Sequence, residues 1–167
     1  MLTRKELRQI YDRVGTWQDA QSFYEGPAVD RLLDHGDFGR ARSVVEIGCG
    51  TGALARQLLA DRCPETTTYE AVELSPVMAD LARRRLKPWK DRVRIRRTAG
   101  APPLERPDAS ADRIVIAYVL DLMPESEIRW LLREARRVLR PGGLLCTCGL
   151  APGRSRLARI VEMLWRI

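Results

Sequence analysis

The sequence has few of the residues from which metal and redox centres are built. It contains one histidine, His35, and four cysteines, and no two cysteines form a C-x-x-C pair. A zinc site needs about four such ligands at matched spacing, so no metal site is predicted. Cys146 and Cys148 stand two apart in a predicted strand, where they share one face and are interpreted as packing residues.

Long apolar segments are also missing. No run reaches the roughly 18 residues of a membrane-spanning helix, and no apolar signal segment follows Met1–Lys5. We therefore expect a cytoplasmic protein. A chain of 167 residues with 45% hydrophobic residues suits one globular domain, predicted over residues 1–167.

The net charge of +7 raises the question of a nucleic-acid partner. The arginines are scattered, with local clusters at 83–85 and 92–97 that have no aromatic residues between their members. The first cluster falls on the solvent side of a predicted helix, and the second alternates with apolar residues as in a half-exposed strand. Both are interpreted as solvated faces. Nucleic acid is not expected as a partner, whereas anionic substrates and membrane surfaces stay open.

The chain is organised around residues 44–52, which have the sequence V-V-E-I-G-C-G-T-G and precede an amphipathic run at 53–59. This order predicts a buried strand, a tight turn and a helix. Glycine allows the sharp bend and the close approach of a ligand. The start of the helix offers unpaired N–H groups to that ligand. We therefore predict a small-molecule site at this turn.

Two cofactor classes compete for the turn. Residues 48–53 satisfy the dinucleotide pattern G-x-G-x-x-G/A, but the carboxylate of Glu46 would repel a pyrophosphate. An acid here favours a cationic ligand such as a sulfonium. The stretch resembles the first motif of the class I S-adenosylmethionine-dependent methyltransferases. This resemblance implies that the following residues contact S-adenosylmethionine: Glu46, Gly48, Cys49, Gly50, Thr51 and Gly52.

A second segment, residues 67–76, predicts a strand followed by a helix start, with Ser75 as the N-cap and Pro76 as the first helical residue. Glu73 ends the strand just over twenty residues beyond Gly50, a placement that suits a carboxylate accepting ribose hydroxyls. The sequence E-L-S-P resembles the family's second cofactor segment, which implies contacts from Glu73 and Leu74.

The third predicted strand, residues 93–97, is followed by a departure from the family pattern. The family commonly has Gly-Asp there, and the aspartate reaches the adenine amino group. This chain has Thr98, Ala99 and Gly100 instead. Backbone groups of Ala99 or Gly100 are expected to take over the adenine contact. The proline-rich residues 101–107 are predicted as a loop.

The fourth predicted strand, residues 111–120, carries Tyr118 near its carboxyl end, where ligands gather in open α/β sheets. Tyr118 either flanks the sulfonium or the acceptor, or packs. Asp121 could orient an acceptor proton. Together with Tyr24, these two residues are the catalytic candidates, and no catalytic base is assigned.

Strands that alternate with helices predict an α/β fold, a Rossmann-like, doubly wound and mostly parallel sheet with helices on both faces. The clearest helical periodicity runs from Pro124 to Leu139, and a fifth strand is predicted from Leu144 to Cys148. The family usually continues with two more strands, which have no counterpart here. The fifth strand is therefore expected to be an uncovered edge.

The flanking segments are assigned from the same resemblance. Residues 1–40 are predicted as a helical lid over cofactor and acceptor, residues 41–150 as the cofactor-binding core, and residues 151–167 as a basic amphipathic helix. This last helix and the exposed fifth strand are expected to contact a membrane or a second copy in a homodimer, or the helix packs on the core.

The resemblance implies a methyltransferase that moves a methyl group from S-adenosylmethionine to a small-molecule or lipid acceptor and leaves S-adenosylhomocysteine. Two alternatives stay open. The first is an NAD(P)-binding oxidoreductase on the same fold. The second is a catalytically inactive S-adenosylmethionine-binding module, which the absent aspartate and the short C-terminus would allow.

Overall fold

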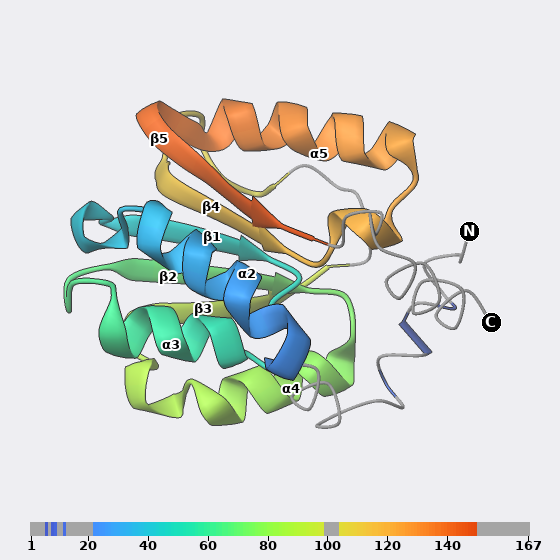
Figure 1. Cartoon of the computed structure of the whole chain (residues 1–167), viewed down its shortest axis with the longest axis horizontal. Coiled ribbons are helices and arrows are strands. Elements are labelled where there is room, and N and C mark those ends of the chain that lie inside the picture. The colour runs from blue at the N-terminus through green and yellow to red at the C-terminus, as the bar shows by residue number, and fades with distance from the viewer. Residues whose placement is uncertain (1–5, 7, 10–11, 13–21, 99–103, 150–167) are drawn as a thin grey trace.

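The computed structural model describes residues 6, 8–9, 12, 22–98 and 104–149 of the chain. Five parallel strands form one sheet in the order β3-β2-β1-β4-β5 (Figure 1). The strands are β1 (Ser43–Ile47), β2 (Thr68–Glu73), β3 (Val93–Arg97), β4 (Ala111–Ala117) and β5 (Leu139–Cys148). The helices are α2 (Ser22–His35), α3 (Ala53–Asp61), α4 (Pro76–Arg85) and α5 (Glu125–Val138). Three short 3-10 helices are η2 (Phe38–Arg40), η3 (Lys87–Trp89) and η4 (Leu120–Leu122).

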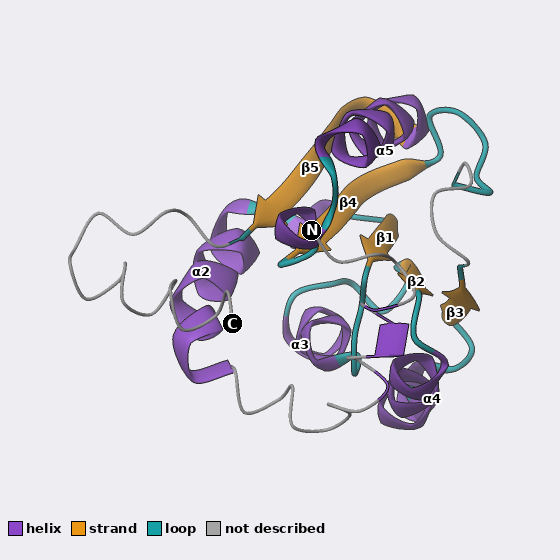
Figure 2. Cartoon of the chain, turned by 90° about the vertical axis from the view of Figure 1, so that its right-hand side faces the viewer, coloured by secondary structure: helices purple, strands orange, loops and turns teal. Residues whose placement is uncertain are grey.

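Helices cover both faces of the sheet. Figure 2 shows α2, α3 and α4 on one face and α5 on the other. The sheet has a hydrophobic core on each face, and successive residues of β1 pack into opposite cores. Val44 packs in the cluster with α2, α3 and α4, and Val45 packs in the cluster with α5. This two-sided burial explains the continuous apolar run of the central strands. The expected doubly wound α/β fold is confirmed.

The sheet order places a switch in winding direction at β1. From β1 the chain winds outward to β2 and β3, and it then returns to the other side of β1 for β4 and β5. In such sheets ligands bind in the crevice outside the carboxyl ends of the two strands at the switch. Here these strands are β1 and β4, whose carboxyl ends lie beside each other because Ile47 pairs with Ile116.

The fifth strand begins earlier than predicted. Leu139 already pairs with Ala111, and a bulge then separates this pair from the pairing of Leu144 with Arg113. Residues 140–143 form the bulge, and Gly142 within it has φ 79°. The prediction of a helix through Leu139 was therefore one residue too long, because Leu139 is the extended C-cap residue of α5.

The segments that flank the core are only partly described. The C-terminal helix predicted at 151–167 lies outside the described residues, as do residues 1–5, 7, 10–11 and 13–21 of the segment predicted as a lid. Helix α2 belongs to that segment, and its Leu32 and Leu33 are buried in the sheet core. Within the described sheet β5 pairs only with β4, as expected for an edge strand. Within that same part, no helix is long and apolar enough to span a membrane.

A buried arginine joins the end of α2 to the sheet. The side chain of Arg113 on β4 is 7% exposed. Its Nε donates to the carbonyl of Gly36 at 2.5 Å, and its Nη2 donates to the carbonyl of Asp37 at 2.7 Å. Asp37 has a left-handed backbone with φ 45°. The guanidinium therefore satisfies the carbonyl of buried Gly36, which would otherwise lack a donor, and also binds the more exposed carbonyl of Asp37.

We expect Arg113→Ala to lower the free energy of unfolding by about 1–3 kcal/mol, because the buried carbonyl of Gly36 loses its charged donor. Urea denaturation followed by circular dichroism measures this loss. Arg140→Ala is the matched control, since it removes a 44% exposed arginine whose partner is Asp112, and it should cost less than about 1 kcal/mol. Equal losses for the two variants would contradict the anchoring role of Arg113.

Candidate cofactor site at the carboxyl ends of the strands

The glycine turn lies where the fold predicts a ligand site, between β1 and α3. Its backbone is docked on the end of β2, because the N–H of Gly48 donates to the carbonyl of Val72 at 2.8 Å. Gly48, Gly50 and Gly52 all have positive φ, at 74°, 52° and 79°. Residues with side chains rarely adopt this conformation, so three glycines are explained by backbone geometry.

Close contacts within the protein add a second reason for two of these glycines. A Cβ on Gly48 would overlap the side chain of Val119, which follows β4. A Cβ on Gly52 would lie 3.1 Å from the Cα and Cβ of Ala82 on α4. Glycine was expected at this turn for the approach of a ligand, and packing within the protein requires it at these two positions as well.

Glu73 connects the glycine turn to the turn after β2. Its Oε2 accepts from the N–H of Gly50 at 2.9 Å, and its Oε1 accepts from those of Leu74 and Ser75 at 2.8 and 2.9 Å. Glu73 is buried, with only 7% of the residue exposed. Burial raises the pKa of Glu73, and the three backbone hydrogen bonds oppose the shift. A carboxylate is therefore held at the junction of the two motifs predicted to bind the cofactor.

Glu46 is a second buried acid on the same face of the sheet, 2% exposed. The hydroxyl of Tyr69 on β2 donates to its Oε2 at 3.0 Å. Burial raises the pKa of Glu46 to about 7, the hydrogen bond from Tyr69 lowers it, and the charge of Glu73 raises it. This role of Tyr69 was not predicted from the sequence. Strand alternation was the available signal, since Tyr69, Ala71 and Glu73 face the same side as Glu46 once β1 and β2 pair.

Asp12 is another residue that sequence reasoning missed. Its Oδ1 accepts from the hydroxyl of Ser75 at 2.6 Å, while the same hydroxyl caps α4 by accepting from the N–H of Met78 at 3.1 Å. The negative charge of Asp12 also contributes to the raised pKa of Glu73. A residue from the N-terminal segment thus lies at the end of β2, beside the predicted ribose-binding acid. No local sequence signal marks a contact between positions 63 residues apart.

The remaining predicted residues of the two turns have clear positions. Thr51 is buried, and its hydroxyl accepts from Nη1 of Arg85 on α4 at 2.5 Å. Burial raises the pKa of the Cys49 thiol well above its usual range, which keeps it protonated and unreactive. Leu74 is half-buried and offers its N–H to Glu73. Cys146 and Cys148 pack toward one core cluster, as predicted.

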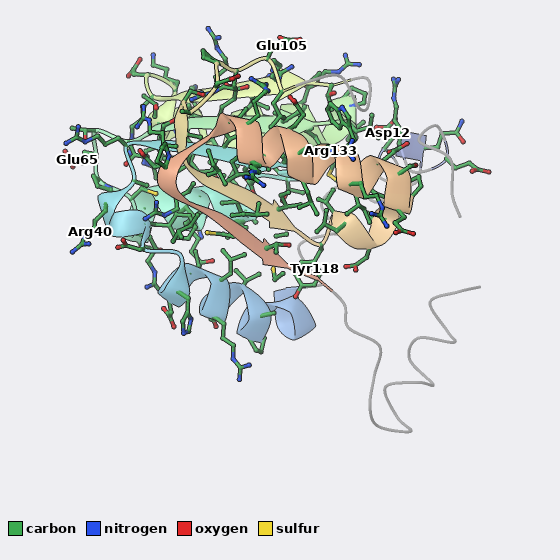
Figure 3. All side chains as sticks on the ribbon, turned by 90° about the horizontal axis from the view of Figure 1, so that it is seen from above. Asp12, Arg40, Glu65, Glu105, Tyr118 and Arg133 are labelled. Carbon is green, nitrogen blue, oxygen red and sulfur yellow. The ribbon has the colours of Figure 1, made fainter. Side chains whose placement is uncertain are left out.

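The acceptor-side candidates lie at the ends of β4 and β5. Tyr118 follows β4 with φ 56°, a left-handed conformation that is uncommon for an aromatic residue (Figure 3). Its N–H donates to the carbonyl of Cys148 at 2.9 Å. Asp121 lies in η4, and its carboxylate is close to Gly149, where a Cβ would come within 2.6 Å of Oδ2. Both residues therefore lie at the carboxyl ends of β4 and β5, and Val119 between them packs against Gly48 at the switch.

Three predicted residues cannot be placed with the others. Ala99 and Gly100 lie outside the described residues, so the expected adenine contact stays a prediction. Tyr24 belongs to α2, but its side chain lies outside the described part of the chain. No group of three or more metal-ligating side chains occurs among the residues that the structure describes.

Comparison with known proteins identifies the family of the chain. The family model described as a methyltransferase domain matches residues 44–143, which run from β1 to β5. The chain belongs to the class I S-adenosylmethionine-dependent methyltransferase family. The match includes both carboxylate-bearing turns and β4, the strand that Tyr118 follows.

Individual methyltransferases give the same result. The chain is 29% identical over 171 residues to the demethylmenaquinone methyltransferase of Tropheryma whipplei (strain Twist), a match that covers 96% of this chain and 66% of that protein. It is 26% identical over 152 residues to the malonyl-[acyl-carrier protein] O-methyltransferase of Serratia marcescens, covering 91% of this chain and 55% of that protein. The chain therefore spans between about half and two thirds of the length of these relatives.

A solved structure shows the fold of this methyltransferase family in the same arrangement. The mitomycin 7-O-methyltransferase MmcR superposes with a TM-score of 0.71 at 22% identity, covering 96% of this chain and 45% of that one. At this level of identity the likeness concerns the fold alone.

The pKa of Glu46 makes the stability of this methyltransferase fold depend on pH. The folded pKa of about 7 exceeds the ordinary value of 4.5, so Glu46 ionises first in the unfolded chain as the pH rises. The stabilisation from its protonated form is complete below about pH 4.5 and is lost as the pH rises through about 7. The free energy of unfolding of the wild type should therefore fall by about 3 kcal/mol between pH 4.5 and pH 8, relative to that of the Glu46→Gln variant.

Urea denaturation of both proteins across this range measures the difference, since other titrating groups cancel in the comparison. Tyr69→Phe serves as the companion variant. It removes the hydroxyl that favours the ionised carboxylate of Glu46. The pKa of Glu46 should therefore rise, and the loss of stability with rising pH should continue to a higher pH than in the wild type. A constant difference between wild type and Glu46→Gln would show that Glu46 is not perturbed.

Proposed function

We propose that this chain binds S-adenosylmethionine against the glycine turn and transfers its methyl group to a small-molecule or lipid acceptor. The observation that carries the proposal is the pair of buried carboxylates, Glu46 and Glu73, on either side of the turn. Among the described residues no cationic side chain forms an ion pair with either acid. Buried acids without such a partner are costly, and a ligand that brings positive charge offsets the cost.

The residues around Glu73 fit the ribose of this cofactor. A carboxylate has about four acceptor sites, and backbone N–H groups occupy three of those of Glu73. One ribose hydroxyl can therefore donate to Glu73 without displacing a bond. The second can replace a backbone donor or donate to Asp12, whose carboxylate lies at the same turn. We infer that Asp12 belongs to the lid assigned to residues 1–40.

Glu46 suits the cationic methionine end. At neutral pH its pKa leaves the carboxyl part protonated, and a neighbouring cation would favour the ionised form. S-adenosylmethionine supplies a methyl group that is already activated on a sulfonium. The chain then needs to orient an acceptor in line with that group and exclude water, and Tyr118 and Asp121 border the place where the acceptor would enter.

The names of two relatives support a small or lipid-like acceptor. By their names, one acts on demethylmenaquinone and the other on malonyl-[acyl-carrier protein]. A nicotinamide dinucleotide is the rival ligand, but its diphosphate would lie beside the carboxylate of Glu46, and Glu73 already accepts from the N–H of Gly50 in the glycine turn. An inactive binding module is the other alternative, and it differs from an enzyme only in turnover.

Substitution of Glu73 tests the cofactor site. We expect Glu73→Gln to weaken S-adenosylmethionine and S-adenosylhomocysteine binding by about 1–3 kcal/mol, about 5- to 150-fold, because a buried hydroxyl donor loses its charged acceptor. Isothermal titration calorimetry measures both affinities, and titration with NAD in the same buffer tests the rival.

Glu70→Gln is the matched control for this titration. Glu70 lies on β2 but faces away from the turn, where it pairs with Arg96 and Arg106. Its loss should leave cofactor affinity unchanged. Tight NAD binding, or equal effects of the two variants, would contradict the assignment.

A transfer assay tests the activity and the acceptor class. The chain is incubated with methyl-labelled S-adenosylmethionine and cell extract, and the label is then separated into lipid, small-molecule, protein and RNA fractions. We expect the label in the lipid or small-molecule fraction. Label confined to protein or RNA would refute the acceptor class, and normal binding without any transfer would identify an inactive module.

A further inference from the structure

The whole net charge of the chain resides in one segment. Nine of its 29 lysines and arginines, but only two of its 22 aspartates and glutamates, fall between residues 76 and 98, which leaves 20 of each sign for the rest. The segment therefore carries +7, the net charge of the complete chain. It comprises α4, η3 and β3.

The fold gathers these charges on one edge of the molecule. In the described sheet β3 pairs only with β2, and α4 packs beside β3 (Figure 1). The arginine clusters at 83–85 and 92–97, separate in the sequence, are thus neighbours in space. We refer to α4, η3 and β3 together as the basic edge.

Most cations of the basic edge have no counter-charge. Five are exposed and make no ion pair or side-chain hydrogen bond within the described residues: Arg84, Lys87, Lys90, Arg94 and Arg97. Of the two acids, Asp80 is already paired with Arg83 at 2.6 Å. Arg96 is likewise paired, with Glu70 and Glu105. The excess positive charge is therefore presented to solvent.

Local stability explains only part of this arrangement. Arginines in the last turn of α4 interact favourably with the helix dipole, and charged side chains on β3 prevent edge-to-edge pairing. Neither reason applies to Lys87 and Lys90, which lie in and just after η3. Half-buried Trp89 stands between them, and Val77 on α4 is 38% exposed.

We propose that the basic edge docks on an anionic lipid bilayer. Isolated cations spread over a broad edge suit a diffuse, planar array of negative charge, to which each contributes independently of exact geometry. Nucleic acid fits less well, because Trp89 is the only aromatic residue of the segment and packs toward the core, so stacking of bases is not offered. This docking does not require methyl transfer, but it would bring the chain to a lipid acceptor.

Vesicle sedimentation tests the proposal with the full chain. The probes are vesicles of phosphatidylcholine alone and vesicles of phosphatidylcholine mixed with phosphatidylglycerol. The chain should sediment with the anionic vesicles only, and binding should weaken as salt rises, because the Debye length falls from about 10 Å at 0.1 M to about 3 Å at 1 M. Absence of binding to anionic vesicles at low salt would overturn the proposal.

Two charge-matched variants locate the surface. The double variant Lys87→Glu with Lys90→Glu replaces two cations of the basic edge that lie neither in the last turn of α4 nor on β3. Arg133→Glu with Arg136→Glu makes the same change in net charge on α5, where both arginines are exposed. Arg133 is labelled in Figure 3. In Figure 1 α5 lies across the molecule from α4. Circular dichroism melting confirms that both variants fold.

We expect the first variant to lose at least tenfold in vesicle affinity, since each cation near an anionic surface contributes about fivefold, and the second to change it little. Equal losses would overturn the proposal, because net charge alone would then be responsible. An RNA probe is included in parallel. If the basic-edge variant loses RNA binding while neither protein binds vesicles, the edge is a nucleic-acid surface and the membrane assignment is wrong.

Discussion

The carboxylate of Glu73 holds together two turns that are distant in the sequence. It accepts hydrogen bonds from Gly50 after β1 and from Leu74 and Ser75 after β2, so the positions of both turns depend on one buried side chain. The positive φ angles of the three glycines allow the first turn to approach this acid. Through the hydroxyl of Ser75, the same junction also reaches Asp12 and the N-terminus of α4.

This junction places unfavourable charge in the interior. Glu46 and Glu73 are both buried, and burial together with their mutual proximity raises the pKa of Glu46 to about 7. A fold selected for stability alone would gain by replacing such acids with apolar residues. Their presence beside an open backbone turn is understandable when the ligand is a cation with a hydroxylated sugar, which supplies the missing positive charge and hydrogen-bond donors.

Local sequence patterns were sufficient for much of the fold. The glycine turn, the N-cap at Ser75 with Pro76, and the long periodic helix before β5 lie where short-range signals predicted them. The start of β5 was missed because residues 139–143 carry proline and glycine, which indicate a turn, whereas pairing of Leu139 with Ala111 draws the chain into the sheet. A long-range hydrogen-bond partner overrode the local preference.

The sequence by itself determined the two acids, the turns that present them and the order of strands and helices, because each depends on residues near one another along the chain. Only the tertiary structure decided which distant side chains complete the site. Tyr69 meets Glu46 because β1 and β2 pair in parallel with a particular register, and Asp12 meets Ser75 because the N-terminal segment returns to the sheet. The basic edge likewise exists only because α4 packs on β3. Such contacts arise from packing between elements, for which the sequence has no local pattern.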